Sequence, residues 1–252
     1  MQKFHRLLTF TQYLSFIQDN MIPLPQKITY KKLNENCGKI EIEPLYPGYG
    51  TTLGNDLRRV LLSSLEGAAI TEFKIKGVAH EFMTIDGVLE DVIQIMQNLK
   101  KLRFKIFTEE PQTISLKQKG EKEILGKDFQ IPPQLELVNP ETHIATLTSK
   151  DAVLEMEAKV EKGIGYLPRE ERQSDEIGKI LVDAIFSPVK KVGIFIENVR
   201  VGKRTDFEKL ILQIETDGTI SPKEAFLKSC EILLNHYSFF KENLKEDEKK
   251  ET

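Results

Sequence analysis

Cysteine and histidine are scarce in this chain, and neither is grouped in a way that would build a metal site. The 252 residues include two cysteines, Cys37 and Cys230, and four histidines that do not cluster. No CxxC pair occurs, so the pattern argues against both a zinc site and a disulfide framework. This use of cysteine suits a protein of the reducing cytoplasm.

The short motifs that mark common enzymes are also missing. The chain has no GxGxxG or GxxxxGK[ST] phosphate loop, no GxSxG elbow and no HExxH helix. The best local acid–base pair is His80 and Glu81, but neighbours in a strand point to opposite faces and would not act together. We therefore expect no catalytic residue, no metal and no cofactor in this chain.

Long apolar runs are absent, and the charge is nearly balanced. No stretch of 18 apolar residues occurs, so we expect no membrane span. The net charge of −3 argues against a protein that coats nucleic acid. Residues 1–21 lack periodicity and are predicted to be a disordered extension, with Met21 a plausible true start. Residues 241–252 are predicted to be a disordered charged tail.

The hydrophobic pattern of the remaining residues predicts an α+β fold. Residues 38–45 and 68–76 alternate as half-buried strands, and residues 103–162 read as short strands separated by turns. Helices are predicted at 53–65, capped by Thr52, and at 88–102, capped by Asp86. Long strands at 190–199 and 207–216 precede a helix that begins at Ser221-Pro222 with a capping box.

Two helix faces suggest protein contacts. Asn55, Arg59 and Leu62 share a face opposite the predicted inward stripe of Leu53, Leu57, Val60, Leu61 and Ser64, so Arg59 is either a solvated arginine or part of a partner surface. The last helix has an apolar face too wide for one sheet to cover. That face is either sandwiched inside one domain or packed against a second copy of the chain.

Several segments resemble the bacterial and plastid RNA polymerase α subunit family. The longest is EPLYPGYGTTLGNDLRRVLLSSL at 43–65. Further matches follow in order: GVAHEF at 77–82 with GVLEDV at 87–92, LVDAIFSPV at 181–189, RVGKRTDFEKL at 200–210 and ETDGTISPKEA at 215–225. The likeness covers residues 22–240 and implies a dimerisation domain of sheet plus helices (22–66 and 189–240) with a β-rich domain (67–188) inserted into it.

The resemblance also implies partners and the residues that contact them. In the family two α chains dimerise, one then binding the polymerase β subunit and the other the β′ subunit. For the β subunit the matching positions are Asn55, Arg58, Arg59 and Leu62, and for the β′ subunit they are Lys100 and Val182. The dimer contacts implied are Tyr49, Val60, Phe226, Leu227, Cys230, Leu233, Leu234 and Tyr237. A cytoplasmic or plastid-stroma location follows from the same likeness.

Three departures from the family pattern matter. Asp56 replaces a common alanine, where we expect it to pair with Arg58 or Arg59, and Thr51 replaces a common histidine. The sequence ends without the family's small DNA-binding domain, so no direct promoter contact is expected. Two other hypotheses stay open: a dimeric adaptor outside transcription, and an independent enzyme with a substrate pocket in the inserted domain.

Overall fold

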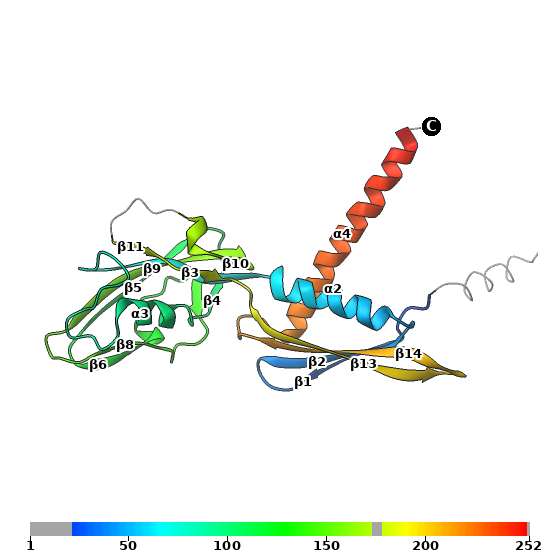
Figure 1. Ribbon diagram of the computed structural model, residues 1–252, viewed down its shortest axis with the longest axis horizontal. Helices are drawn as coiled ribbons and strands as arrows, with labels where there is room; N and C mark the ends of the chain where they lie inside the picture. The colour runs from blue at the N-terminus through cyan, green and yellow to red at the C-terminus, as the bar shows by residue number, and fades with distance from the viewer. Residues whose placement is uncertain (1–21, 173–177, 251–252) are drawn as a thin grey trace, which may run out of the picture.

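The computed structural model describes residues 22–172 and 178–250, with side chains up to Leu244, and it has a mixed α+β fold (Figure 1). The elements in chain order are β1 (Lys27–Lys32), β2 (Cys37–Leu45), α2 (Tyr49–Ser63), β3 (Glu66–Ile75), α3 (Val92–Leu99), β4 (Phe104–Ile106), β5 (Gln112–Lys119), β6 (Lys122–Leu125), the 3-10 turn η1 (Gly126–Asp128), β7 (Leu135–Leu137), β8 (His143–Leu147), β9 (Val153–Ile164), β10 (Tyr166–Leu167), η2 (Arg169–Glu171), β11 (Lys179–Leu181), β12 (Ala184–Ile185), β13 (Val189–Val201), β14 (Arg204–Thr216) and α4 (Pro222–Lys250).

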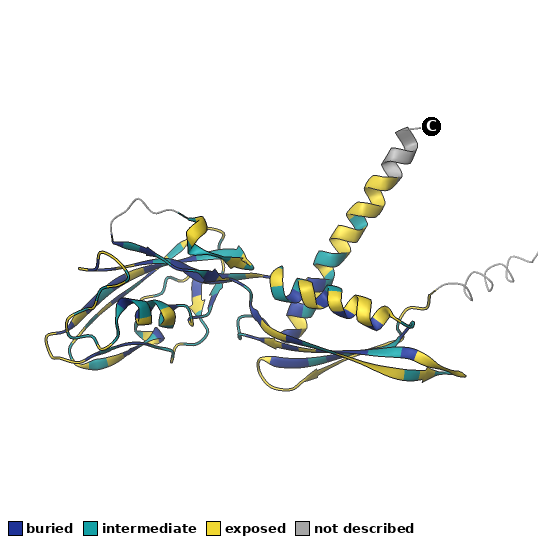
Figure 2. Ribbon diagram, viewed as in Figure 1, coloured by how far each residue is buried: buried dark blue, intermediate teal, exposed yellow. Residues whose placement is uncertain are grey.

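The first and last parts of the chain together build one antiparallel sheet, in the order β1-β2-β14-β13. In its centre Ile42 pairs with Leu210 and Ile40 with Leu212. Helices α2 and α4 pack on one face of this sheet, where the dark-blue buried residues of Figure 2 gather. We call this unit the small-sheet lobe (residues 27–65 and 189–250). Its buried core consists of Ile40, Ile42, Leu45, Leu57, Leu61, Leu65, Val189, Val192, Leu210, Leu212, Ile214, Ile220 and Ala225.

The opposite face of the same sheet carries a ladder of charges. Lys209 Nζ lies 2.8 Å from a carboxylate oxygen of Glu41 and 3.7 Å from one of Glu43. Lys39 lies 2.6 Å from Glu41, and Lys27 lies 3.2 Å from Glu43. Alternation along β2 therefore places isoleucine against the helices and glutamate on the outer face, as a sheet covered on one side requires.

Residues 66–185 form a second unit, the large-sheet lobe, which is mostly strand. Its main sheet has the order β5-β9-β3-β4-β7, with β11 paired to β3, and two further pairs are β6–β8 and β10–β12. Helix α3 buries Val92, Ile95 and Leu99 in its core. This core draws only on residues 68–182 and is separate from the core of the small-sheet lobe.

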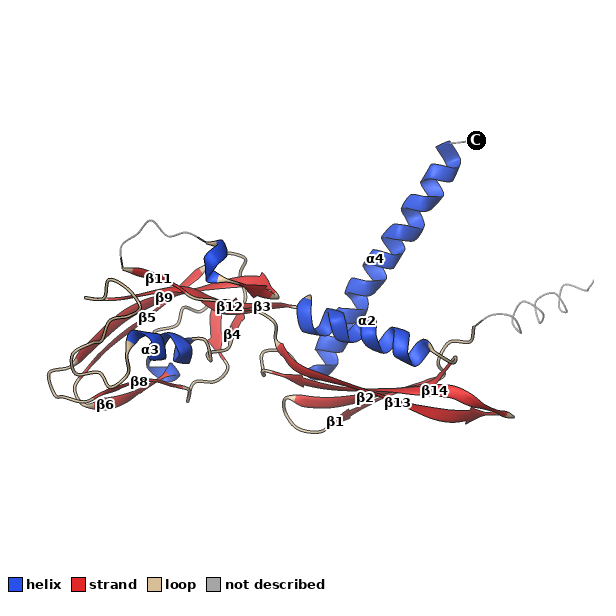
Figure 3. Cartoon of the chain, viewed as in Figure 1, coloured by secondary structure: helices blue, strands red, loops and turns tan. Residues whose placement is uncertain are grey.

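The two lobes are joined where the chain passes from α2 into β3 and back from β12 into β13 (Figure 3). At this crossing Gly67 and Gly163 leave room for Phe186, because a Cβ at Gly67 would overlap the carbonyl oxygen of Phe186. A second tie is the ion pair between Arg103 Nε and Asp217 Oδ2, 3.4 Å apart, which links the end of the α3 segment to the turn before α4.

The structure confirms three of the predicted strands and the start of the last helix, and it corrects two predicted helix caps. The strands expected at 38–45, 68–76 and 207–216 lie within β2, β3 and β14 to within one residue. The start of the last helix is also confirmed, since Glu224 N–H donates to Ser221 Oγ at 3.2 Å. The cap at Thr52 is wrong, because α2 begins at Tyr49 after Gly48. The cap at Asp86 is wrong too, because α3 is capped by Asp91, whose side chain accepts from Gln94 N–H.

Both ends of the chain are predicted from the sequence to be disordered. The expected disordered extension, residues 1–21, lies outside the described residues. Disorder from residue 241 was also predicted, but α4 continues to Lys250. Lysine, glutamate and leucine all favour helix, so a polar segment already joined to a helix can extend it without a packed face.

The charge ladder yields a prediction about stability and pH. Hydrogen bonds from Lys209 and then Lys39 lower the pKa of Glu41 from its ordinary 4.5 to about 2. Because the folded-state pKa is depressed, ionised Glu41 stabilises the fold above about pH 4.5, and this stabilisation is lost as the pH falls towards 2. We expect Glu41→Gln to lower the free energy of unfolding by about 1 kcal/mol at pH 7. Urea unfolding at a series of pH values should show the deficit shrinking below pH 4.5.

The control is Glu35→Gln, which removes an exposed ion pair to Lys32 and should have no measurable effect. A Glu41→Gln deficit that stays constant down to about pH 2 would contradict the assignment.

Candidate functional site

The N-terminus of α2 is held by a carboxylate from a distant strand. Gly48 N–H donates to Glu208 Oε1 at 2.9 Å, and Gly50 N–H donates to Glu208 Oε2 at 2.8 Å. Gly48 has a φ of +86°, in the left-handed region that glycine enters without strain. A negative charge suits the positive end of the helix dipole. Glu208 on β14 therefore caps the N-terminus of α2 and fixes where the helix starts.

Glycines also let α2 lie unusually close to the sheet. A Cβ at Gly50 would stand 2.7 Å from Glu208 Oε2, and one at Gly54 would stand 3.0 Å from Leu210 and 3.1 Å from Ile194. The buried stripe of α2 is Gly50, Gly54, Leu57 and Leu61. The segment GYGTTLG is thus a packing surface as well as a turn.

The side of α2 turned away from the sheet carries the residues expected to bind the β subunit. Asn55, Arg58 and Arg59 are exposed, and Leu62 is half-buried. Among residues 22–172 and 178–250, neither guanidinium group forms a hydrogen bond or an ion pair. These two arginines are therefore free to bind an external carboxylate or carbonyl group.

Asp56 does not pair with either arginine, so that expectation is wrong. Its Oδ2 accepts a hydrogen bond from Tyr237 Oη of α4 at 3.1 Å. This bond to Asp56 raises the pKa of Tyr237. Asp56 faces α4 instead of its neighbours on α2, and it ties the two helices of the small-sheet lobe together.

The wide apolar face of α4 is partly buried against its own lobe and partly exposed. Phe226, Cys230 and Leu233 are partly buried and pack on the core of their own lobe. Leu227, Leu234 and Tyr237 remain 50%, 64% and 54% exposed. Beyond them α4 projects away from the rest of the molecule (Figure 1), with Phe239, Phe240 and Leu244 also exposed.

Helix α2 carries two more residues that are expected at the dimer contact. It also carries Leu53, which is expected to point inward. Tyr49 is exposed at the start of α2, and Val60 is half-buried further along the helix. Leu53 was predicted to point inward but is exposed, because Gly50 and Gly54 take the positions nearest the sheet. The exposed apolar surface of the small-sheet lobe thus extends over both helices.

The two positions expected to contact the β′ subunit differ in accessibility. Lys100, at the C-cap of α3, is on the surface, and its Nζ lies 3.1 Å from Asp183 Oδ2. Val182 is completely buried in the core of the large-sheet lobe. Its side chain does not reach the surface, so a direct side-chain contact from Val182 does not fit this structure. The apolar segment around Val182 has no alternation of apolar and polar residues, so the sequence did not indicate which side chain faces outward.

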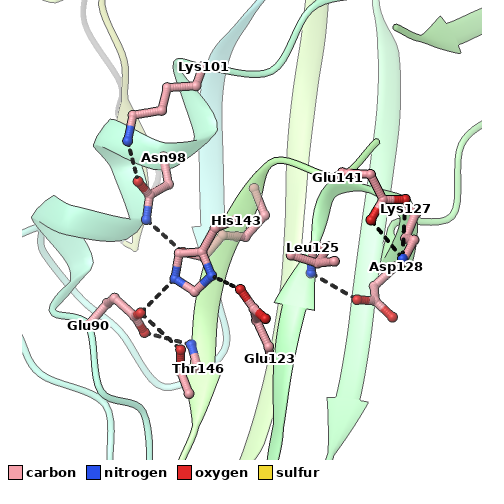
Figure 4. A network of polar contacts seen from close by, with 11 residues as sticks. Glu90, Asn98, Lys101, Glu123, Leu125, Lys127, Asp128, Glu141, His143 and Thr146 are labelled. Carbon is pink, nitrogen blue, oxygen red and sulfur yellow. Dashed lines mark hydrogen bonds and ion pairs between the residues drawn. The ribbon is translucent and has the colours of Figure 1, made fainter. Parts of the chain in front are cut away.

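His143 on β8 is the centre of a polar cluster in the large-sheet lobe (Figure 4). Its Nε2 lies 2.8 Å from Glu90 and its Nδ1 lies 2.9 Å from Glu123. Burial opposes protonation of His143, but the hydrogen bonds to Glu90 and Glu123 outweigh it and raise its pKa. Glu90 also accepts from Thr146 N–H at 2.6 Å. The cluster joins the loop before α3 to β8 and β6. Its side chains form their hydrogen bonds with one another.

His80 and Glu81, the acid–base pair considered from the sequence, each contact other residues. Glu81 forms an ion pair with Arg169 at 3.3 Å, and His80 packs against the ring of Phe82. In the described part of the chain no group of three or more metal-binding side chains comes together. No helix in that part is long and apolar enough to cross a membrane. The features that stand out are surfaces: the free arginines of α2 and the exposed apolar side of α4.

The two-lobed α+β fold thus leaves the arginines of α2 and several apolar side chains of α4 exposed. The family model for the "RNA polymerase Rpb3/RpoA insert domain" matches residues 73–187, which span most of the large-sheet lobe. Among curated proteins, the DNA-directed RNA polymerase subunit alpha of Roseiflexus castenholzii is 50% identical over 210 residues, covering 83% of this chain and 65% of the relative. The subunits of Aquifex aeolicus and Oceanobacillus iheyensis are each 46% identical, covering 68% and 69% of their length.

The chain belongs to the family of DNA-directed RNA polymerase α subunits. It spans about two thirds of the length of the relatives it matches.

The capping carboxylate yields a prediction about α2. We expect Glu208→Gln to lower the free energy of unfolding by about 1–2 kcal/mol, because an amide nitrogen replaces one of the two acceptors and the favourable charge at the helix N-terminus is lost. Chemical denaturation of the purified chain is the measurement. The matched control is Glu215→Gln, an exposed glutamate on the same strand. Equal stability of the two variants would show that Glu208 does not hold α2.

Proposed function

We propose that this chain is a scaffold subunit of RNA polymerase, which forms a homodimer and assembles the β and β′ subunits in the cytoplasm or plastid stroma. It contributes no catalytic residue or cofactor, and the chemistry belongs to its partners. In this proposal residues 22–66 and 189–240, which include most of the small-sheet lobe, are the dimerisation domain. Residues 67–188, which include nearly all of the large-sheet lobe, are a domain inserted into it. The match of the insert-domain model to residues 73–187 supports that division.

The observation that carries the proposal is the free arginine pair on an immobilised helix. Glu208, Gly50 and Gly54 fasten one side of α2 to the sheet. The opposite side presents Arg58 and Arg59 without internal partners in the described chain. A guanidinium group that has no polar partner in the described chain, on a helix held against a sheet, is well suited to bidentate binding of a partner. Asn55 and Leu62 complete the proposed contact with the β subunit.

Dimer formation is supported by the exposed apolar residues of α4. Leu227, Leu234 and Tyr237 lie on the same helix whose other side is already buried in the lobe. A second copy of the chain would cover them, together with Tyr49 and Val60 of α2. An interface in which each protomer offers the same helices is the usual two-fold arrangement.

We expect the chain to sediment as a dimer at micromolar concentration, and Leu234→Asp to weaken it. A carboxylate buried in an apolar interface should raise the dimer dissociation constant by about 30-fold or more, or about 2 kcal/mol. Sedimentation velocity over a dilution series measures this. Asn235→Asp adds the same charge at an exposed position on the same helix and should leave the dimer intact. A wild-type monomer, or equal behaviour of the two variants, would contradict the proposed interface.

Arg59→Ala should leave the fold and the dimer intact but prevent capture of the β subunit. Little internal burial is lost, whereas the partner's acidic or carbonyl groups would be left desolvated, which costs about 2–5 kcal/mol. Arg59→Lys should rescue poorly because lysine lacks the planar fork. The measurement is reconstitution of the complex of two α chains and one β subunit, with circular dichroism and sedimentation as fold controls.

Arg200→Ala, which removes an exposed arginine on the small-sheet lobe, is the matched control. Normal assembly of Arg59→Ala would overturn the site. Unfolding of that variant would show instead that Arg59 is a structural residue.

A further inference from the structure

His143 lies between two carboxylates that come from opposite sides of β8. Its Nε2 atom is 2.8 Å from Glu90 Oε1 in the loop before α3, and its Nδ1 atom is 2.9 Å from Glu123 Oε1 on β6. An imidazole ring donates a hydrogen bond to each of two acceptors only when both of its nitrogens carry a proton. A neutral ring would turn a lone pair toward one of the carboxylates. The geometry therefore requires the charged form of His143.

Glu90 is the more firmly held of the two carboxylates. Its Oε2 atom accepts from Thr146 N–H at 2.6 Å, and its Oε1 atom accepts from Thr146 Oγ1 at 3.2 Å. Its side chain is 12% exposed, compared with 60% for Glu123. Burial opposes ionisation of Glu90, but the hydrogen bonds from Thr146 and His143 outweigh it and lower the pKa of Glu90. Glu90 is therefore an ionised acceptor at this site.

The lysines nearest to the cluster have partners of their own (Figure 4). On the turn η1, Lys127 Nζ lies 2.8 Å from a carboxylate oxygen of Glu141. On α3, Lys101 Nζ donates to Asn98 Oδ1 at 2.8 Å. The charged groups that contact the His143 ring are thus the two carboxylates. Burial opposes protonation of the ring, but these carboxylates outweigh it and raise the pKa of His143.

The loop that contains Glu90 leads directly into α3. Leu89 N–H donates to Thr146 O at 2.9 Å, so the loop lies along the edge of β8 that is away from β6. At the next residue the Glu90 carboxylate takes the place of strand pairing, because it accepts from Thr146 N–H. Asp91 then caps α3. A weaker hold on Glu90 would therefore act on this loop and on the first turn of α3.

We propose that His143 is a pH-dependent clamp, which holds β6 and the loop before α3 together across β8 while its ring is protonated and loosens them when the ring loses its proton. Because the folded-state pKa is raised above the ordinary 6.5, the stabilisation is complete below about pH 6.5. It is lost as the pH rises through the folded-state pKa of His143. The neutral ring keeps one N–H and can donate to only one of the two carboxylates. The clamp lies within one lobe, so its test needs no partner subunit.

The test is amide hydrogen exchange of the full chain over about pH 6 to 9, with each rate divided by the intrinsic rate of an unfolded amide at the same pH. NMR titration of the His143 ring in the same sample gives the midpoint of its protonation. We expect protection of the Leu89, Gln94 and Thr146 amides to fall about tenfold as the pH passes this midpoint, because a charge-assisted hydrogen bond is lost. In His143→Gln, whose side chain does not titrate, protection of these amides should not change with pH.

Two further variants and one internal reference complete the test. His236→Gln is the matched control, because His236 lies on α4, where its Nδ1 is 2.8 Å from Ile232 O of the same helix. That variant should keep the wild-type pH dependence. Glu123→Gln removes one carboxylate and should lower the midpoint of the His143 titration. The amide of Gln130, which donates to Ser115 O at 2.7 Å elsewhere in the lobe, should stay protected throughout.

The clamp is overturned if protection in the wild-type chain stays constant through the His143 titration, or if it falls equally in His143→Gln. A ring that titrates at or below the ordinary value of 6.5 would overturn it as well. The wild-type titration and exchange need no substitution, so they decide the matter even if His143→Gln does not fold.

Discussion

The carboxylate of Glu208 and the two backbone amides that it accepts from determine much of what this chain presents to others. The contact joins residues 158 and 160 positions apart in the sequence, with distances of 2.8 and 2.9 Å. It satisfies amide groups that every helix N-terminus leaves open. Because Gly50 and Gly54 carry no side chain, α2 lies against β13 and β14, and its far side becomes a fixed platform for Arg58 and Arg59.

The two lobes use polar contacts in different ways. In the small-sheet lobe the ladder from Lys27 to Glu41 lies on the solvent face, so the opposite face is left to α2 and α4. In the large-sheet lobe buried apolar residues fill a core of their own, and charged contacts tie loops to it. His143 joins three segments through Glu90 and Glu123, and Asp183 joins three more. In both lobes polar contacts thus hold together segments that lie far apart in the sequence.

The sequence was most informative where a pattern is local. Alternation predicted β2 because its two faces have different surroundings, and Ser221-Pro222 predicted the start of α4. Strand β1 went unrecognised because all six of its residues are exposed and it is held by pairing to β2 alone. The start of α2 was placed too late because its cap, Glu208, comes from another part of the chain.

The candidate site shows the same division. The exposure of Asn55 and Arg59 followed from helical spacing, and the wide apolar face of α4 is covered only in part by its own lobe. The bond between Asp56 and Tyr237 did not follow, because nothing local shows which of several neighbours a carboxylate will meet. The burial of Val182 was hidden for a similar reason, since its apolar segment has no alternation to show which residue faces the core.

The central claim is that α2 is fastened to its sheet before any partner binds. Amide hydrogen exchange of the free chain tests this most directly, by comparing residues 49–63 with residues 204–216 in the wild-type chain and in Glu208→Gln. The account predicts that both segments exchange slowly in the wild-type chain and that the substitution speeds exchange in α2 while β14 stays protected. Rapid exchange of α2 in the wild-type chain, or no response to the substitution, would contradict it.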